Sequence, residues 1–175
     1  MWCTMGAVEI QARVRLGTEW MSGFGQILED LRADPLTSSQ HIDMMGSLSE
    51  DLVSTDAIVR AEKGRGGWCT SEILRVKAER MLREKGLKAA PCAAAVLQTA
   101  LETARQQGAL SWELRTAMSL ARLWRDQQAP RAAHDLLAAV YGRFSEGFET
   151  ADLAAAWRLL QELAAVFEGS TDLTE

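Results

Sequence analysis

The placement of three tryptophans relative to glycines is the feature that most constrains the fold of this chain. Trp20, Trp68 and Trp112 each stand where a helical pattern begins, shortly after a glycine that ends the preceding segment. The two intervals between these tryptophans are 48 and 44 residues. An interval of this length accommodates two helices and their turns, and a recurring two-helix unit is the signature of a helical solenoid. We therefore predict stacked helical pairs.

The residues between the turns support an all-α fold. Alanine, leucine, glutamate and arginine dominate the segments between the prolines at 35, 91 and 130, and all four are strong helix formers. Alternating runs of β-branched residues, which would indicate strands, do not occur. The pattern predicts helices over residues 6–16, 18–33, 47–63, 68–85, 91–107, 111–127, 130–142 and 150–168.

Capping signals set the expected helix ends. Ser47 and Glu50 fit a capping box, and Ser111 and Thr150 are suited to be N-caps. Proline stands in the first turn of the helices predicted over 91–107 and 130–142, where its missing N–H costs nothing. Glycine is the usual residue just past a helix end, and it is expected to end helices at positions 17, 86, 108 and 169.

The register within the repeats refines this architecture. Small residues recur at Ala78 and Ala121 on the first helices and at Ala93 and Ala133 on the second helices, which lets paired helices approach closely. We predict one TPR-like α-solenoid domain over residues 1–169, with about three helical hairpins and a C-terminal helix. Its units cover roughly 18–63, 68–107 and 111–142, followed by a closing helix over 150–168 and a frayed tail over 170–175. No structure is predicted for 34–46.

Composition excludes several functional classes. The chain has 175 residues, a net charge of −5 and a pI near 5.2, which disfavours a nucleic-acid binder because such proteins need a basic face. Its three cysteines form no CxxC motif, as expected of reduced thiols in a cytoplasmic protein. No apolar run approaches the length of a membrane span, and the N-terminus does not resemble a signal peptide.

Three stretches resemble one bacterial family of sequences. They are "GGWCTSEILRVKAERMLREKG", "LETARQQGALSWELRTAMSLARLWRDQ" and "LLAAVYGRFSEGFETADL". They resemble the C-terminal TPR-like region of signalling proteins in which a class III adenylate/guanylate cyclase or a winged-helix transcriptional activator domain precedes an AAA-type ATPase module. The resemblance covers residues 64–165. It implies that this chain is a protein–protein interaction or scaffold module in signalling or transcription regulation. It also implies that the chain is the truncated tail of such a cyclase- or ATPase-type protein.

The catalytic parts of those proteins have no counterpart in this sequence. There is no GxxxxGK[ST] motif to cradle a phosphate, and "KGRGGW" continues into a helix without the required lysine. The paired aspartates of a cyclase are also missing. We therefore predict a non-enzyme without cofactor or metal. The alternative is a nucleotide-binding or cyclase-related enzyme fragment, and a third possibility is a small-molecule sensor.

Other reactive side chains do not form a recognisable site in the sequence. His41 and His134 stand far apart, without acids or cysteines at metal-ligand spacing. Cys69 lies near a helix N-terminus, which can activate a thiol, but a packing role is the simpler interpretation. The acids between residues 29 and 56, which include Asp43 and Asp56, are interpreted as a solvated face. We predict no catalytic residue.

A set of charged residues suggests how the predicted scaffold binds a partner. If Ala78 and Ala121 mark the close-packed side of their helices, the concave groove of a TPR-like stack carries a mostly basic set, formed by Arg75, Glu79, Arg83, Arg115, Arg122 and Arg125. Arginine forks bind carboxylates, so the hypothesis is an acidic or C-terminal peptide ligand. The simpler alternative is a solvated helix surface. An open solenoid end at the N-terminus also suggests a homodimer.

Overall fold

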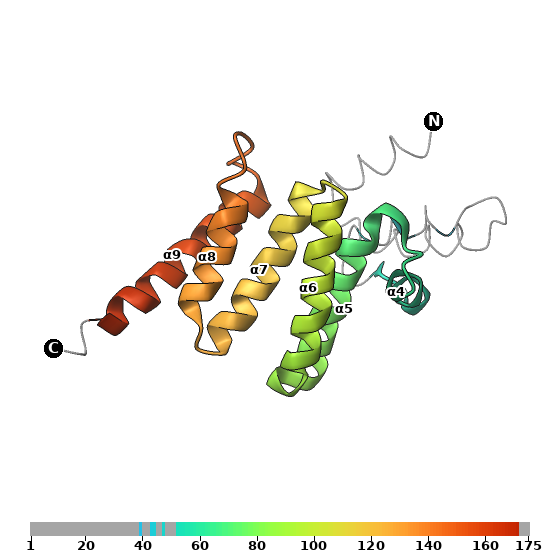
Figure 1. The fold of residues 1–175 in the computed structure, drawn as a ribbon, viewed down its shortest axis with the longest axis horizontal. Helices are drawn as coiled ribbons and strands as arrows, with labels where there is room; N and C mark the ends of the chain where they lie inside the picture. The colour runs from blue at the N-terminus through green and yellow to red at the C-terminus, as the bar shows by residue number, and fades with distance from the viewer. Residues whose placement is uncertain (1–38, 40–42, 45–46, 48–51, 172–175) are drawn as a thin grey trace, which may run out of the picture. The chain divides into compact units, whose positions relative to one another are not determined.

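The computed structural model describes residues 39, 43–44, 47 and 52–171, and within these residues the chain is helical and contains no strand. The all-α prediction is therefore confirmed for this part of the chain. The chain divides into two compact units, residues 1–76 and 77–175, with the boundary inside the helix over 70–85. Figure 1 shows the helices. The helices are α4 (Thr55–Glu62), η2 (Gly67–Cys69), α5 (Thr70–Lys85), η3 (Gly86–Ala89), α6 (Ala90–Gln106), α7 (Leu110–Asp126), α8 (Pro130–Tyr141) and α9 (Ala151–Thr171).

In the first unit, helix α4 begins later than predicted. Its N-cap is Ser54, whose hydroxyl oxygen accepts a hydrogen bond from the Ala57 amide at 3.1 Å. The helix predicted from residue 47 is wrong in its start, because residues 53 and 54 are not helical, and the Ser47 hydroxyl donates to the Met44 carbonyl oxygen at 2.7 Å; Glu50, the other member of the predicted capping box, lies outside the described residues. A serine hydroxyl serves equally well in a turn or at a cap, so the sequence pattern did not distinguish the two.

In the second unit, four helices pack against one another in chain order. Helix α6 packs against α7, α7 against α8, and α8 against α9, as Figure 1 shows, and α7 also contacts α9. The side chains between them form one apolar core that includes Leu97, Leu114, Leu137 and Leu163, none more than 1% exposed. Burial of such side chains is the main favourable term in folding. This core therefore holds α6 to α9 together.

The predicted close-packing alanines are confirmed as core residues. Ala78, Ala93, Ala121 and Ala133 have no exposed surface. Trp124 packs against the same core from a half-buried position. A methyl group at these four positions allows the helix backbones to approach, and larger neighbours fill the remaining space.

Glycine signals predicted most helix ends correctly, but side-chain caps were predicted less well. Gly86 and Gly108 have φ values of +59° and +64°, the left-handed conformation in which glycine commonly follows a helix. Ser111 is not an N-cap, because α7 already begins at Leu110 after Ala109, without a side-chain cap. Gly169 does not stop α9, which continues to Thr171. A glycine inside a helix costs only about 1 kcal/mol, so it does not necessarily end one.

The tryptophans that suggested the repeat take different places. Trp68 lies in η2, just before α5, and is 53% exposed, whereas Trp112 is the third residue of α7. Trp20 and the helices predicted over 6–16 and 18–33 lie outside the described residues. The single repeat domain over 1–169 and its unit boundaries stay a prediction.

Candidate functional site

A surface pocket of about 330 Å³ lies in the second unit between the C-terminal part of α5 with η3 and the C-terminal half of α7. Its lining residues on α7 recur every three or four positions and so share one helix face. Leucines supply most of the apolar wall, and four charged residues complete the lining. The pocket is formed by Glu79, Leu82, Gly86, Leu87, Ser119, Arg122, Leu123, Arg125 and Asp126.

Three of the six residues predicted to line the groove meet in this pocket. They are Glu79 from α5 and Arg122 and Arg125 from α7. Asp126 adds a second carboxylate, so the charged lining is balanced between two arginines and two acids. The pocket is therefore less basic than the sequence set indicated. The sequence analysis missed Asp126, although its position four residues after Arg122 places it on the same helix face.

Two arginines of α7 are engaged by acids within the unit. A nitrogen of Arg125 donates to Glu162 at 3.3 Å, and its Nε donates to the neighbouring Asp126 at 3.1 Å. The Nε of Arg115 lies 4.0 Å from Asp152. Both long-range partners belong to α9, and both lie 37 positions further along the chain. Two such pairs with the same offset show that α7 and α9 run parallel.

Arg122 differs from its neighbours because its guanidinium has no ion-pair or hydrogen-bond partner among the residues that the structure describes. The residue is exposed, whereas Arg125 is half-buried. An exposed guanidinium beside an apolar wall has five N–H donors available to a ligand. Arg122 is therefore the cation of this pocket that is available to a carboxylate.

The remaining residues predicted for the groove do not line this pocket. Arg75 belongs to the first unit and is only 5% exposed, because its guanidinium forms a two-point ion pair with the buried Glu72 at 2.9 Å. The prediction that Arg75 lines the groove is therefore wrong, since a buried, paired arginine does not present its charge to a ligand. Arg83 is exposed on α5 but does not line the pocket. Burial of this kind depends on tertiary packing and leaves no trace in the helical periodicity.

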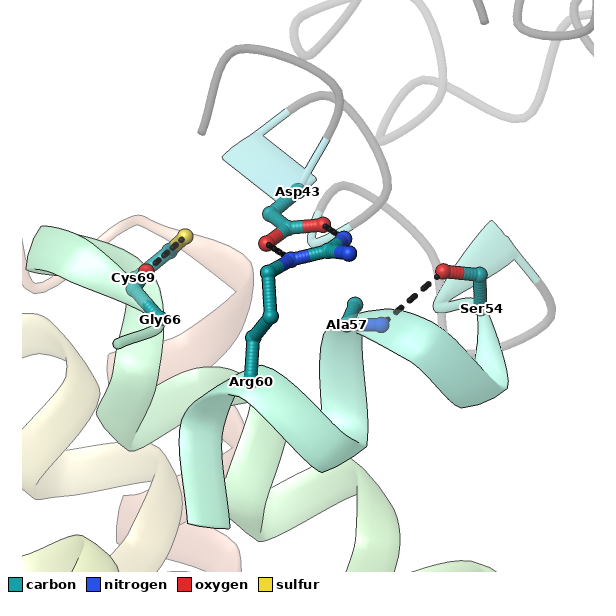
Figure 2. Close-up of polar contacts among 6 residues, drawn as sticks. All are labelled: Asp43, Ser54, Ala57, Arg60, Gly66 and Cys69. Atoms are coloured by element: carbon teal, nitrogen blue, oxygen red, sulfur yellow. Dashed lines mark hydrogen bonds and ion pairs between the residues drawn. The ribbon is translucent and has the colours of Figure 1, made fainter. Parts of the chain in front are cut away.

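The acids and the thiol of the first unit form a structural cluster. Figure 2 shows Arg60 of α4 clamping the carboxylate of Asp43, with its Nε 2.9 Å from the nearer carboxylate oxygen. Asp43 is 2% exposed, so its interpretation as part of a solvated acidic face was wrong, whereas Asp56 is exposed. The Asp43–Arg60 pair joins the segment before α4 to the helix.

Cys69 is a packing residue. Its Sγ donates to the Gly66 carbonyl oxygen at 3.3 Å, as Figure 2 shows, and the residue is 1% exposed. Burial, together with a smaller effect of the nearby Asp43 charge, raises the pKa of the Cys69 thiol to about 11. A thiol in that state carries almost no thiolate at neutral pH and is a poor nucleophile.

Of the two histidines, the structure describes His134. His134 is half-buried on α8, and its Nδ1 lies 3.5 Å from the carboxylate of the next residue, Asp135. His41 lies outside the described residues. Among the residues that the structure describes, no three acid, histidine or cysteine side chains are placed to hold a metal ion.

Glu113 is an important residue that the sequence analysis missed. It stands in the first turn of α7, is 2% exposed, and accepts hydrogen bonds from the Nε of Arg105 at 2.9 Å and from the Nη1 of Arg143 at 2.5 Å. The carboxylate thereby ties the end of α6 and the segment after α8 to the start of α7. Its partners are 8 and 30 positions away, so no short-range pattern could have indicated the cluster.

No family model, no curated protein and no solved structure matches this chain. Within the described part of the chain, no helix combines the length and apolar character needed to cross a membrane.

Proposed function

We propose that this protein is a non-catalytic, TPR-like scaffold module that binds an acidic segment of a partner protein in the pocket between α5 and α7. The observation that carries the proposal is the exposed guanidinium of Arg122, which is without a partner among the described residues and stands beside an apolar wall. A scaffold role in bacterial signalling or transcription regulation is what the resemblance of residues 64–165 implies.

The helix arrangement of the second unit supports a TPR-like stack. In such a stack the first helices of successive pairs run parallel and line one groove. The two ion pairs between α7 and α9 have an offset of 37 positions, close to the roughly 34 residues of a tetratricopeptide unit. The pocket lies between α5 and α7, which are the first helices of successive predicted pairs.

The chemistry of the pocket favours a carboxylate beside an apolar side chain. Arg122 can donate two parallel N–H bonds to one carboxylate, which gives both strength and orientation. Leu82, Leu87 and Leu123 provide apolar surface next to it, and Leu87 is 60% exposed. The carboxylates of Glu79 and Asp126 would repel a second acid placed beside them, so we expect a ligand with spaced acidic residues.

The proposal is tested with fluorescein-labelled octapeptides in which leucine alternates with glutamate or, in the control peptide, with lysine. Binding to the full chain is followed by fluorescence anisotropy. We expect the glutamate peptide to bind and Arg122→Glu to weaken its binding about tenfold or more, since a charge-assisted hydrogen bond is worth about 1.5–3 kcal/mol.

Arg131→Glu is the matched control. Arg131 is also an exposed helical arginine, and it does not line the pocket. We expect this variant to bind the glutamate peptide within about twofold of the unmodified chain, since distant surface charges are screened by salt. Equal weakening by both variants would show general charge attraction and contradict the proposal, as would equal binding of the lysine peptide.

A further inference from the structure

A second pocket lies elsewhere in the same unit, where the end of α8, the following loop and the first half of α9 meet. Its volume is about 390 Å³, and it is lined by Tyr141, Phe148, Ala154, Trp157 and Arg158. None of these residues lines the pocket between α5 and α7. Three of the five are aromatic, which is a large share for a chain in which aromatic residues make up 6% of the sequence.

The local backbone brings the three rings together. Tyr141 is the last residue of α8 and packs against the core of the unit. Gly147 has a φ of +77°, and its carbonyl oxygen accepts the Thr150 amide at 2.9 Å, which turns the chain just before α9. This turn places Phe148 with its ring centre 5.9 Å from that of Tyr141.

The third ring comes from α9. The ring centre of Trp157 lies 6.0 Å from that of Tyr141, within the range of favourable aromatic pairs. Ala154 stands one helical turn earlier, and its small side chain leaves room beside the indole. Tyr141 therefore anchors both outer rings to the core, and the rings form a preorganised apolar surface.

The outer rings are open to solvent. Phe148 is 47% exposed and Trp157 is 51% exposed, which is unusual for large apolar side chains that lie together. Arg158 is exposed at the edge of the pocket, and its guanidinium has no ion-pair or hydrogen-bond partner among the described residues. The pocket thus combines uncovered aromatic surface with an available positive charge.

We infer that this pocket binds an apolar, preferably aromatic, side chain of a partner polypeptide that carries a carboxylate on the adjacent residue. The ligand side chain stacks between Phe148 and Trp157, and the carboxylate accepts hydrogen bonds from Arg158. Aromatic and arginine side chains are the groups that most often dominate binding at protein interfaces. The positive charge of Arg158 selects against a cationic ligand, for which an aromatic surface would otherwise be suited.

The openness of the pocket favours a polypeptide over a free small molecule. A small-molecule site buries most of its ligand and fixes it through several placed polar groups. This pocket has half-exposed rings and one guanidinium, so a ligand needs further contacts along the surface. A polypeptide supplies them. This site is independent of the proposed function, which rests on the pocket between α5 and α7.

The experiment uses two-dimensional NMR of the full chain with ¹⁵N-labelled tryptophan, in which the indole signal of Trp157 is assigned by its loss in Trp157→Phe. The probe is the blocked tetrapeptide acetyl-Gly-Phe-Asp-Gly-amide, and the comparison peptides replace phenylalanine with alanine or aspartate with lysine. We expect saturable shifts of the Trp157 signal with the probe. Binding should weaken about two- to fivefold with the lysine peptide, because an exposed ion pair contributes modestly, and more with the alanine peptide.

Two variants separate the pocket from general charge effects. Arg158→Ala should weaken binding of the probe to the level of the lysine peptide, whereas Arg131→Ala should leave it unchanged. If the probe causes no saturable shift at Trp157, or if Arg131→Ala weakens its binding as much as Arg158→Ala, the inference is wrong. Equally tight binding of free N-acetylphenylalanine would identify a small-molecule site instead. Sedimentation that shows self-association dependent on Trp157 would identify a second copy of the chain as the occupant. Either of these two results would also overturn the inference that a partner polypeptide occupies the pocket.

Discussion

Removal of the Glu113 carboxylate is the most informative test of how the second unit is held together. The carboxylate is buried between Arg105 and Arg143, at oxygen–nitrogen distances of 2.9 and 2.5 Å. It joins the end of α6 and the segment after α8 to the start of α7. Glu113→Ala deletes both ion pairs and leaves a cavity in the place of the carboxylate, while the apolar core below it stays intact.

The expected magnitude follows from the burial of the partners. A hydrogen bond to a charged group contributes about 1.5–3 kcal/mol, and removal of one partner of a buried ion pair costs about 3–5 kcal/mol. The side chains of Arg105 and Arg143 are 50% and 53% exposed, so both guanidiniums regain water and the loss is smaller. We expect Glu113→Ala to lower the free energy of unfolding by about 2–4 kcal/mol, which corresponds to about 5–15 °C in Tm for a chain of 175 residues.

The assay is urea denaturation followed by circular dichroism, with Tm measured by calorimetry. Glu146→Ala is the control, since Glu146 is exposed in the loop before α9, and surface substitutions usually change stability by less than about 0.5 kcal/mol. A double-mutant cycle with Arg105→Ala measures the coupling directly, and we expect about 1 kcal/mol or more. A loss below about 0.5 kcal/mol for Glu113→Ala, or zero coupling in the cycle, would refute the reasoning.

Further predictions concern the thiols and two glycines. The pKa of Cys69 is about 11 in the folded protein against 9.0 as the ordinary value, so the unfolded chain loses this proton first, and stability should fall by up to about 2–3 kcal/mol between pH 9 and 11. A pH series of urea midpoints should show this fall, and Cys69→Ala should abolish it. Iodoacetamide at pH 8 should modify the exposed Cys92 in the folded protein and Cys69 only in denaturant, as peptide mass spectrometry would show; early modification of Cys69 would be contrary to its burial. Gly66→Ala should destabilise by about 2–3 kcal/mol in urea denaturation, because a Cβ there would lie 3.0 Å from the Cα of Ala61. At Gly86 an added Cβ would meet open space, but the φ of +59° strains any residue with a Cβ, so Gly86→Ala should lower the free energy of unfolding by about 1 kcal/mol. An equal loss of stability for Gly66→Ala and Gly86→Ala would contradict the steric clash at Gly66.

The helices were predictable because their signals are local. The helix over 91–107 was predicted from Pro91 and the alanine-rich run, and the structure has it from Ala90 to Gln106. Gly86 and Gly108 marked turns because only glycine adopts a positive φ without strain. Serine caps were less predictable, because the Ser47 hydroxyl had an equally good partner in its own turn at Met44.

The candidate site was predicted only in part, for a physical reason. The pattern of α7 placed Arg122 and Arg125 near one another on the helix surface, and the structure brings both to the same pocket. Which arginine stays available depends on its surroundings in the fold: Arg125 meets Glu162 of α9, whereas Arg75 pairs with Glu72 of its own helix in a place where packing buries both. Periodicity describes one helix at a time, so it contains neither Glu162 nor the burial of the Arg75–Glu72 pair.

The sequence by itself determined the helical class, most helix boundaries of the described chain and the alanines at which helices approach, because each depends on a few adjacent residues. Tertiary structure alone decided that Glu113 is clamped between two distant arginines, that Arg122 remains available, and that Tyr141, Phe148 and Trp157 gather in one pocket. These properties depend on which surfaces lose water when the helices pack. That loss of water is a property of pairs of elements and is not encoded in any single stretch of the chain.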